Sequence, residues 1–508
     1  MSQEEKFSAS RRSFLAKAAA ATVTTALSAT GEAQNQAQGK APAGRSRKRP
    51  LNVLFFMSDD MRPELASYNS RFHVHSPNID ALGAKGVRFD RNYCQFPLCN
   101  PSRASLMSGH PPHGTGVLGN RDDLRKLHPE WTTLPQLFRQ NGYTTLRTGK
   151  IFHGGIDDPE AWSDFDGSTE SLHMTQSGRP MNIPHALIPK PDGVLPVLPV
   201  DNKQAEHSDQ IFVLDGNGEG AGDYVVADRA IQYLRHCKDK PFFVACGFSK
   251  PHSPPTAPQR FFDMYDPAKL TLPPDFAAWP TVPEGFPKAA IRMRNADLFI
   301  GRGASESEAK EVIRAYIASI SWVDYNLGRV LAELDSLGLR DNTVVVFVAD
   351  HGYQLGEKGK WSKAGSLFEG GTRVPLIIHA PGAHGNGRPS LRVVESLDIY
   401  RTAAELCGLE VPEQMEGKSL TRLLHNPGAT WDRPAYSIWS EDGKTVHGTA
   451  VRTEQWRYAE YGKDAANGAM LFDVHADPME LKNLAEEARH KDVRGRLSKL
   501  IADYSYPA

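Results

Sequence analysis

Residues 99–103 read Cys-Asn-Pro-Ser-Arg and continue as Ala-Ser-Leu-Met-Ser up to Gly109. The prediction of the fold starts from this stretch. Pro101 suits the first position of a helix and Asn100 is a good N-cap, so a helix is expected to begin directly after Cys99. The free N–H groups and the positive dipole end of such a helix attract an anion and lower the pKa of a thiol. Arg103, one turn further on, adds a fork of donors suited to a tetrahedral oxyanion. The stretch therefore predicts an anion-binding helix start.

The composition is that of an ordinary globular protein. A chain of 508 residues predicts one large catalytic domain with a smaller one. The formal net charge of -1 gives no basic surplus, which argues against nucleic acid as a partner. Five cysteines are too few for a dense disulfide framework, and because the number is odd at least one is unpaired.

The N-terminal residues have the form of an export signal. Residues 10–17 read Ser-Arg-Arg-Ser-Phe-Leu-Ala-Lys, as in a twin-arginine signal. The apolar stretch that follows, residues 18–27, is too short and too weakly apolar to predict a transmembrane span. We therefore expect a signal over residues 1–33, a solvated linker over 34–50, and export to the bacterial periplasm or beyond the cell.

Four predicted strands end in chemically active side chains. Three near-continuous apolar runs, 51–57, 241–247 and 343–349, and a strand ending at residue 149 are typical of buried parallel strands. Ligand sites in open α/β sheets gather at the carboxyl ends of strands, so the side chains there are expected to converge. These side chains are Asp59 and Asp60, Lys150 and His153, His252, and Asp350 with His351. Helical spacing over 306–337 predicts a long helix against the sheet.

The other predicted elements complete an α/β chain. A helix at 77–85 and a strand at 87–93 lead to Cys99 in a βαβ-like unit, and residues 224–238 read as an amphipathic helix. Weak periodicity over 163–223 predicts insertion loops on the substrate side. Short strands at 435–439 and 448–453 and a terminal helix at 486–504 predict a smaller subdomain. The predicted domains are a catalytic domain, residues 51–408, and a C-terminal subdomain, residues 409–508.

Several of these motifs resemble those of the type I sulfatases. Residues 99–103 match the signature Cys-x-Pro-Ser-Arg, and residues 142–153 match Gly-Tyr-x-Thr-x-x-x-Gly-Lys-x-x-His. Blocks at 355–363, 369–377 and 471–485 are also similar and follow in family order. The resemblance implies an alkaline-phosphatase-like α/β fold, in which helices flank a large mixed sheet and a smaller C-terminal α+β subdomain follows.

The resemblance also implies a mechanism and its residues. Cys99 would be oxidised to formylglycine by formylglycine-generating machinery, and the hydrated aldehyde would attack sulfur and displace the sugar alcohol. The implied catalytic residues are Cys99, Arg103, Lys150, His153, His252 and Lys363. One Ca²⁺ ion is implied, with the ligands Asp59, Asp60, Asp350, His351 and the oxygens of residue 99. Imidazole suits softer metals, so His351 is alternatively a group that supports the metal ligands from behind or a sulfate contact, and Mg²⁺ is the less favoured ion.

The substrate prediction is less specific. The Asp-His-Gly, Lys-Pro-His and Gly-Lys-x-Phe-His blocks are most similar to those of iduronate-2-sulfatases, which implies a sulfated carbohydrate partner carrying a 2-O-sulfated uronate. Lys444 is a candidate contact for its carboxylate. The alternatives are an exo- or endo-sulfatase acting on an algal polysaccharide, a phosphonate or phosphate ester hydrolase, and an exported glycan-binding protein with an inactive site. The sequence predicts no particular oligomeric state.

Overall fold

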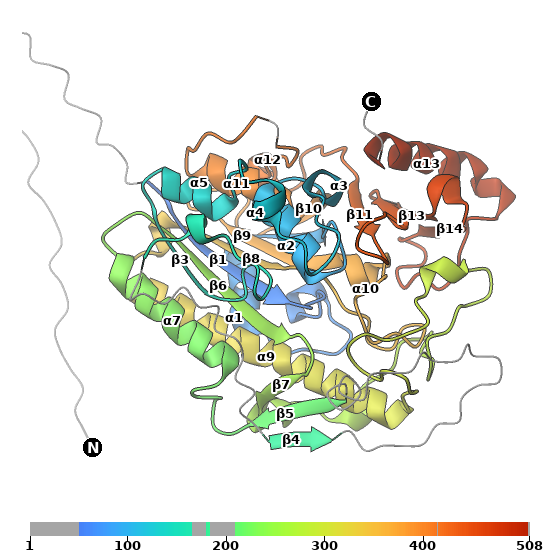
Figure 1. Ribbon diagram of the computed structural model, residues 1–508. Coiled ribbons are helices and arrows are strands. Elements are labelled where there is room, and N and C mark those ends of the chain that lie inside the picture. Colours follow the sequence, from blue (N-terminus) through green and yellow to red (C-terminus); the bar gives the residue numbers. More distant parts are fainter. Residues whose placement is uncertain (1–49, 165–178, 183–208, 414, 506–508) are drawn as a thin grey trace, which may run out of the picture. The chain divides into compact units, whose positions relative to one another are not determined.

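The computed structural model describes residues 50–164, 179–182, 209–413 and 415–505. They belong to one compact unit, built on a seven-stranded mixed sheet (Figure 1). In the order β10-β2-β9-β8-β1-β6-β3, its strands are Pro389–Glu395, Val87–Tyr93, Arg373–His379, Thr343–Ala349, Asn52–Asp59, Phe242–Pro251 and Thr144–Gly149. The predicted signal, nearly all of the predicted linker and much of the predicted insertion at 163–223 lie outside the described residues.

The strand directions bring the predicted site to one edge of the sheet. β1 pairs in parallel with both β6 and β8, and β3 pairs in parallel with β6. β9 is antiparallel to β8 and to β2, which makes the sheet mixed. The carboxyl ends of β1, β3, β6 and β8 therefore lie at the same edge, as the sequence predicted.

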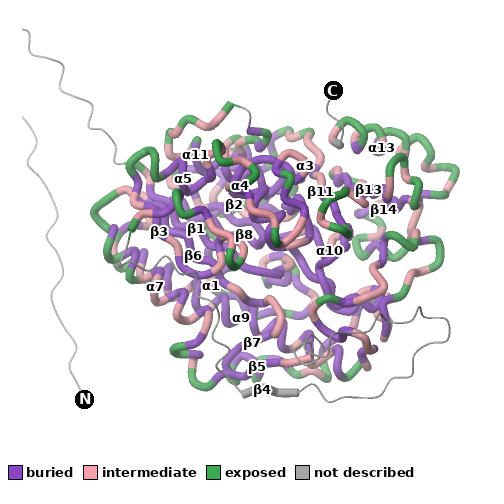
Figure 2. Tube along the Cα trace, viewed as in Figure 1, coloured by how far each residue is buried: buried purple, intermediate pink, exposed green. Residues whose placement is uncertain are grey.

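Alternating residues of β1 face two separate hydrophobic cores. Leu54 and Phe56 pack in the core that includes α1 (Pro77–Lys85), α7 (Gly222–Cys237) and α9 (Glu306–Ser336). The neighbouring residues of β1, of which Phe55 is one, pack in the core that includes α2 (Cys99–Ser108), α5 (Leu134–Gln140) and α11 (Asp398–Leu406). The two helix layers lie on opposite faces of the sheet in Figure 1, and Figure 2 shows its strands as buried. A strand covered on both faces needs the apolar run that β1 has.

The long predicted helix is confirmed as α9. It begins with a capping box in which the Ser305 hydroxyl accepts from the Glu308 N–H, and the Glu308 carboxylate accepts from the Ser305 N–H. Its apolar residues recur at three- and four-residue steps and are buried against the sheet. Together with α1 and α7, this helix covers one face of the sheet.

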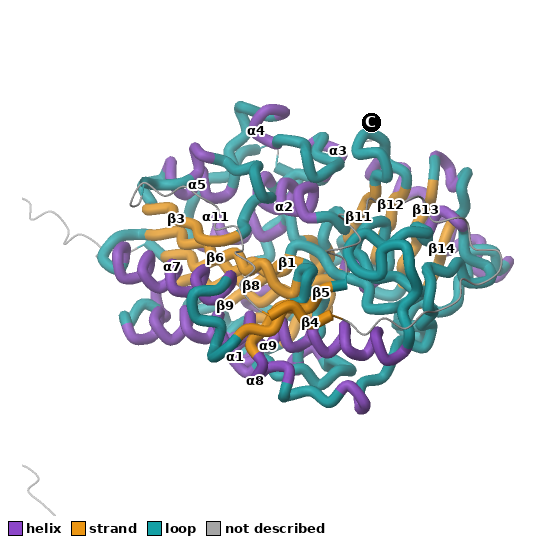
Figure 3. Tube along the Cα trace, turned by 60° about the horizontal axis from the view of Figure 1, so that its bottom comes forward, coloured by secondary structure: helices purple, strands orange, loops and turns teal. Residues whose placement is uncertain are grey.

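A second, antiparallel sheet carries the C-terminal part of the chain (Figure 3). Its strands, in order, are β11 (Ala435–Trp439), β12 (Gly448–Arg452), β13 (Trp456–Tyr461) and β14 (Ala469–Asp473). The terminal helix α13 spans Lys491–Ser505, so it begins later than predicted, because a separate 3-10 turn occupies Ala488–His490. The predicted fold class is confirmed, while the boundary at residue 408 stays a prediction.

The remaining elements are short. A small sheet has the order β4-β5-β7, with strands Arg179–Asn182, Gln210–Leu214 and Thr256–Pro258. The short helices are α3 (Pro112–Thr115), α4 (Leu124–Leu127), α8 (Gln259–Phe262), α10 (Glu369–Thr372) and α12 (Thr421–His425). Across the described ranges, no helix combines the length and apolarity that a membrane span needs.

One expectation needs correction. β6 does not stop at residue 247 but continues to Pro251, because its last residues stay paired with the end of β1. The expected βαβ-like unit is present, since β1 and β2 run parallel in one sheet and are joined through α1, although β8 and β9 lie between them. All five cysteines lie in the described part of the chain and are free thiols, which agrees with the expectation of at least one unpaired cysteine.

Candidate active site

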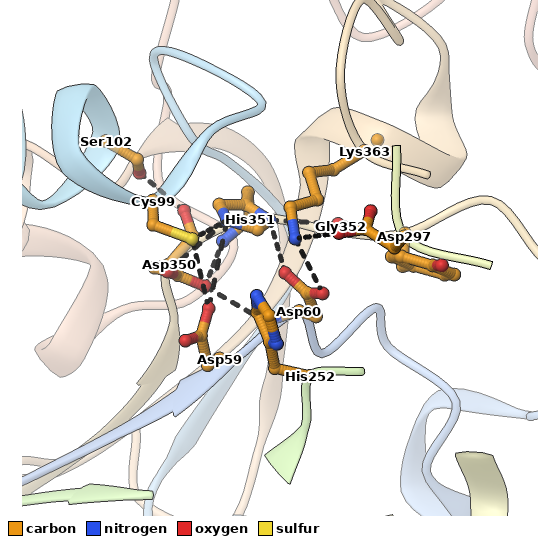
Figure 4. Close-up of polar contacts among 12 residues, drawn as sticks. Asp59, Asp60, Cys99, Ser102, His252, Asp297, Asp350, His351, Gly352 and Lys363 are labelled. Atoms are coloured by element: carbon orange, nitrogen blue, oxygen red, sulfur yellow. Dashed lines mark hydrogen bonds and ion pairs between the residues drawn. The ribbon is translucent and has the colours of Figure 1, made fainter. Parts of the chain in front are cut away.

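Cys99 lies at the centre of a buried polar cluster at the carboxyl edge of the sheet (Figure 4). Its Sγ is 3.5 Å from Asp59 Oδ1 and 3.2 Å from His351 Nε2. Burial and the Asp59 carboxylate would raise the pKa of the thiol, but Lys150, His351 and Lys363 outweigh them and hold it well below its ordinary value. The charges around residue 99 therefore favour the thiolate over the thiol.

The helix start differs from the prediction by two positions. α2 begins at Cys99 itself with Leu98 as N-cap, so Asn100 is not the cap and Pro101 lies within the first turn. The Asn100 side-chain amide instead donates to two carbonyl oxygens of the 119–122 loop, at 2.9 and 2.7 Å. Because the amide has these two partners, it fixes the loop against the first turn of α2 rather than closing the helix.

Three carboxylates and an imidazole surround residue 99. Ligand atoms of Asp59, Cys99, Asp350 and His351 all lie within 4.8 Å of one another. His351 Nδ1 is 3.3 Å from Asp60 Oδ1, which places the second carboxylate of β1 in the same cluster. Burial raises the pKa of Asp350 to about 7 and raises that of Asp60 as well. Burial would also raise the pKa of Asp59, but Lys150 and Arg103 outweigh it and hold that pKa well below its ordinary value.

Asp60 has the features of a ligand held for a metal ion. Its Oδ1 is buried and has no hydrogen-bond partner among the described residues. Its backbone has a φ of 62°, which strains a non-glycine residue and is typical of functional sites. Tyr316 stabilises that conformation by donating from its hydroxyl to the Asp60 carbonyl oxygen at 2.7 Å. An oxygen-rich set with an unused carboxylate oxygen fits a hard cation such as Ca²⁺.

Arg103 directs a donor into the same cluster. Its side chain is fully buried, and its Nε donates to Asp350 Oδ2 at 2.9 Å. One terminal nitrogen, Nη1, donates to the Ile151 carbonyl oxygen at 3.0 Å. The other, Nη2, lies 3.7 Å from Asp59 Oδ1 and makes no hydrogen bond within the described structure. Arg103 thus has a free donor of the kind that binds an oxyanion.

Lys150 reaches the cluster because two glycines allow β3 and β6 to approach closely. Gly149 has a φ of +69°, and a Cβ there would lie 2.0 Å from the Gly247 carbonyl oxygen. The Lys150 N–H donates to that oxygen at 2.9 Å, and its ammonium group forms an ion pair with Asp59. The Gly-Lys pair therefore sets the position of the lysine at the strand end.

Lys363 and His252 come from two other segments. Lys363 Nζ donates to Asp60 Oδ2 at 3.0 Å. His252 supplies a ring nitrogen within 4.8 Å of ligand atoms of Asp59, Asp60 and Cys99. The predicted residues of β1, β3, β6 and β8 thus come together with α2.

Two other candidates are placed less closely. His153 follows β3 by four residues, and its Nδ1 is buried with no hydrogen-bond partner among the described residues. Lys444 donates from its backbone N–H to Asp442 Oδ1 at 2.8 Å in an exposed turn. In the described ranges, neither makes a polar contact with the cluster around Cys99.

Sequence reasoning missed two charged residues that contact this site. Lys250 is fully buried, and its Nζ donates to the carbonyl oxygens of His252 and Pro254 at 2.8 and 2.7 Å. Its place in the Lys-Pro-His block could have drawn attention to it. Asp297 accepts from Lys363 Nζ at 3.2 Å, but no motif surrounds it in the sequence.

A search of protein families agrees with this geometry. The family model "Sulfatase" matches residues 51–409, and the model "N-sulphoglucosamine sulphohydrolase, C-terminal" matches residues 356–506. The chain belongs to the sulfatase family and is a sulfuric ester hydrolase.

Individual relatives cover nearly the whole chain. Human iduronate 2-sulfatase is 30% identical, over 90% of this chain and 95% of its own. A sulfatase of Formosa agariphila is also 30% identical, over 89% of this chain and 86% of its own. The solved phosphonate monoester hydrolase of Silicibacter pomeroyi has a TM-score of 0.68 at 23% identity, over 89% of this chain and 95% of that one. The last similarity shows the shared fold alone.

Proposed function

We propose that this sulfatase removes sulfate from a sulfated sugar, with the 2-O-sulfate of a uronate as the favoured substrate. The observation that carries the proposal is Cys99 at the start of α2, in contact with Asp59 and His351 and beside the free donor of Arg103. A tetrahedral sulfate ester needs both a nucleophile and fixed positive charge, and this cluster offers both. The similarity to human iduronate 2-sulfatase supports the choice of uronate.

We infer that Asp59, Asp60 and Asp350 hold one Ca²⁺ ion. Two features of this chain support a bound cation: Asp60 Oδ1 accepts no hydrogen bond among the described residues, although His351 Nδ1 lies 3.3 Å away, and the pKa of Asp350 is raised. When bound, a divalent cation supplies positive charge that neutralises the sulfate and the charge developing in the transition state. His351 Nδ1 lies 3.0 Å from the Gly352 carbonyl oxygen, which leaves Nε2 facing Cys99. We therefore propose that His351 contacts the side chain of residue 99 and is not a metal ligand.

Position 99 is proposed to carry formylglycine in the active enzyme. That group supplies the nucleophilic oxygen for attack on sulfur. Burial would lower the pKa of His351, but Asp350 and Cys99 raise it to about 10, so its Nε2, 3.2 Å from the side-chain atom of residue 99, is placed to donate a hydrogen bond there. The Lys150 ammonium and Arg103 Nη2 lie on the Asp59 side of the cluster, where they can bind sulfate oxygens.

His252 is proposed to protonate the leaving oxygen. Its Nδ1 lies 2.6 Å from the Ser253 carbonyl oxygen, which orients the ring and leaves the other nitrogen for the site. Burial and Lys363 lower the pKa of His252, but Asp60 and Asp59 outweigh them, so its pKa lies above the ordinary value. A protonated imidazole beside the scissile bond is a suitable general acid. By family resemblance, His153 and Lys363 would contact the sulfate.

Sulfate release by a Cys99→Ala variant tests the proposal. Wild-type enzyme and variant would be given an aryl sulfate, an aryl phosphonate monoester and a panel of sulfated oligosaccharides, with released sulfate and released phosphonate both measured by ion chromatography. We expect wild-type turnover on a 2-O-sulfated uronate and none by the variant. Cys407→Ser, which changes a thiol that packs beside Leu51, is the matched control and should retain activity. Undiminished sulfate release by Cys99→Ala would refute the scheme.

The same preparation tests the modification of position 99. Peptide mass spectrometry should show formylglycine at position 99 in active enzyme, and the unmodified cysteine mass there in fully active enzyme would contradict it. Faster hydrolysis of the phosphonate than of any sulfate ester would favour the phosphonate hydrolase alternative.

We further infer export by the twin-arginine route, with the mature chain beginning near residue 34. Support comes from the Arg11-Arg12 pair and the weakly apolar stretch that follows it in the sequence. Intact-mass analysis of the exported protein would find residues 1–33 removed. A mature protein that still contains Arg11-Arg12 would contradict this assignment.

A further inference from the structure

Lys363 lies between two carboxylates that have different surroundings (Figure 4). Its Nζ is 3.0 Å from Asp60 Oδ2 and 3.2 Å from Asp297 Oδ1, and its side chain is only 5% exposed. Asp60 belongs to the carboxylate cluster proposed to hold Ca²⁺. Asp297 lies outside that cluster, and within the described part of the chain its carboxylate contacts the cluster only through the lysine. The lysine charge is therefore shared between a metal-site residue and an independent partner.

Asp297 is held in place by contacts that do not involve its own carboxylate. Lys360 Nζ donates to the carbonyl oxygens of Arg292 and Arg294, each at 2.7 Å. The Asn295 side-chain oxygen accepts from the Trp361 N–H at 2.9 Å. These bonds attach segment 292–297 to the loop that carries Lys363, so the carboxylate of Asp297 is positioned before it meets the lysine.

The carboxylate of Asp297 is only half paired. Its Oδ2 is buried and has no hydrogen-bond partner among the described residues. Burying a carboxylate with one oxygen unpaired costs free energy. If Asp297 were replaced by a neutral residue, Lys363 would still have Asp60 as a partner. A carboxylate kept at a cost beside a site residue points to a role in function.

We propose that Asp297 is a positioning residue for Lys363, because its carboxylate keeps the ammonium group from pairing with Asp60 alone. The inference rests on the proposed function, because only there do Asp60 bind Ca²⁺ and Lys363 bind sulfate. With Asp297 present, Lys363 stays available to sulfate and Asp60 keeps its charge for the cation. Without it, Lys363 pairs with Asp60 alone and competes with the cation for that carboxylate.

Because of this competition, the effect of Asp297→Asn on Ca²⁺ and substrate binding should depend on Lys363. The variant should bind Ca²⁺ about tenfold more weakly and show a KM for a sulfate ester about tenfold higher, with kcat changed much less. The melting temperature should stay the same or rise, because a half-paired buried carboxylate is gone. Asp297→Glu keeps the charge and should recover much of both affinities. In a Lys363→Met background the competing ammonium is absent, so Asp297→Asn should have no further effect on Ca²⁺ affinity.

A lysine–carboxylate pair on the same loop provides the matched control. Lys358 Nζ donates to Asp275 Oδ2 at 2.7 Å, outside the Cys99 cluster. Asp275→Asn removes a comparable pair and should leave Ca²⁺ affinity and KM unchanged. All variants would be made in the full chain, with Ca²⁺ binding followed by calorimetry, steady-state kinetics on an aryl sulfate, and the melting temperature as third readout.

The outcomes separate the inference from the proposed function. A wild-type protein that binds no Ca²⁺ or releases no sulfate overturns the proposed function. If the wild type does both, three results overturn the positioning role: Asp297→Asn behaves like Asp275→Asn, it lowers the melting temperature more than the control does, or it weakens Ca²⁺ binding equally with Met at position 363. Loss of Ca²⁺ affinity that disappears in the Lys363→Met background supports it.

Discussion

Arg103 shows how one side chain serves both the architecture and the chemistry of the site. Its Nε donates to Asp350 and its Nη1 to two main-chain carbonyl oxygens, while Nη2 has no hydrogen-bond partner in the described part of the chain. Arg103→Lys keeps the charge but cannot present a forked pair of donors. We expect kcat/KM for sulfate ester hydrolysis to fall about 100-fold, which is typical of losing one oxyanion donor. A variant that keeps wild-type kcat/KM would show that the free donor is not used.

His252 can be distinguished from a simple sulfate contact by the leaving group. A general acid matters most when the departing oxygen is a poor leaving group, as in a sugar alcohol, and least for a nitrophenolate. His252→Ala should therefore reduce kcat on a sugar sulfate at least tenfold more than on nitrophenyl sulfate. His153→Ala, at a proposed sulfate contact, should reduce both by the same factor. Equal losses on both substrates for His252→Ala would assign it to sulfate binding instead.

At the level of elements, the end of β6 is held by buried polar contacts. Asp223, at the start of α7, accepts from the N–H groups of Ser249 and Lys250 at 2.9 and 3.0 Å. Burial lowers the pKa of Lys250 to about 8, and its Nζ donates to the carbonyl oxygens of His252 and Pro254. This lysine thus fixes the loop that carries the proposed general acid.

Lys250→Met should reproduce part of the His252→Ala phenotype. Without the two hydrogen bonds to the loop, the imidazole loses its orientation, so kcat on a sugar sulfate should fall about tenfold more than on nitrophenyl sulfate. Lys360→Met is the matched control, since Lys360 is also buried and also donates to two carbonyl oxygens, but at segment 292–297. The control should show no leaving-group selectivity. The same selectivity in both variants would indicate a general loss of packing.

A second contact at the element level links the segment that follows β1 to the loop after β8, and it responds to pH. Burial would raise the pKa of Glu357, but Arg62 and Arg71 outweigh it and lower the pKa from 4.5 to about 2. A carboxylate with a lowered pKa stabilises the fold at pH values above its pKa in the unfolded chain. This contribution is lost as the pH falls toward its pKa in the folded protein. Wild type should therefore be more stable than Glu357→Gln by about 3 kcal/mol near neutral pH.

That difference should shrink as pH falls from 4.5 toward 2, because Glu357 becomes protonated in the folded state as well. Urea unfolding of both proteins at several pH values measures it. A difference that stays constant over this range would show that the Glu357 carboxylate acts through packing rather than through charge.

For the whole molecule, periodic patterns and motif spacing predicted the fold class, the buried strands and the long helix α9. The convergence of Asp59, Lys150, His252 and Asp350 followed from strand ends meeting at one edge of a sheet. What could not be predicted depends on contacts far apart in the chain. The order of the strands, with β8 and β9 between β1 and β2, is set by tertiary packing that no local pattern records.

The same limit applies to single residues. Asn100 resembles an N-cap locally, but a loop some twenty residues away captures its amide, so the helix begins at Cys99 instead. Asp297 carries no motif, and only the attachment of its segment to the Lys363 loop reveals a role. Local sequence thus predicted the groups that belong to the family signatures, while those that position them had to be seen in the structure.

The proposed cation should affect the stability of the entire fold. Its proposed ligands lie at the carboxyl ends of β1 and β8, two adjacent central strands, so a bound ion would join the middle of the sheet. Removing Ca²⁺ with a chelator should abolish activity and lower the melting temperature, and adding Ca²⁺ back should restore both. The free energy of unfolding should rise by RT ln(1 + [L]/Kd), where [L] is the free Ca²⁺ concentration. Asp350→Asn should lose the Ca²⁺-dependent rise in melting temperature. A melting temperature that is independent of Ca²⁺ in the wild type would contradict a metal site at this edge of the sheet.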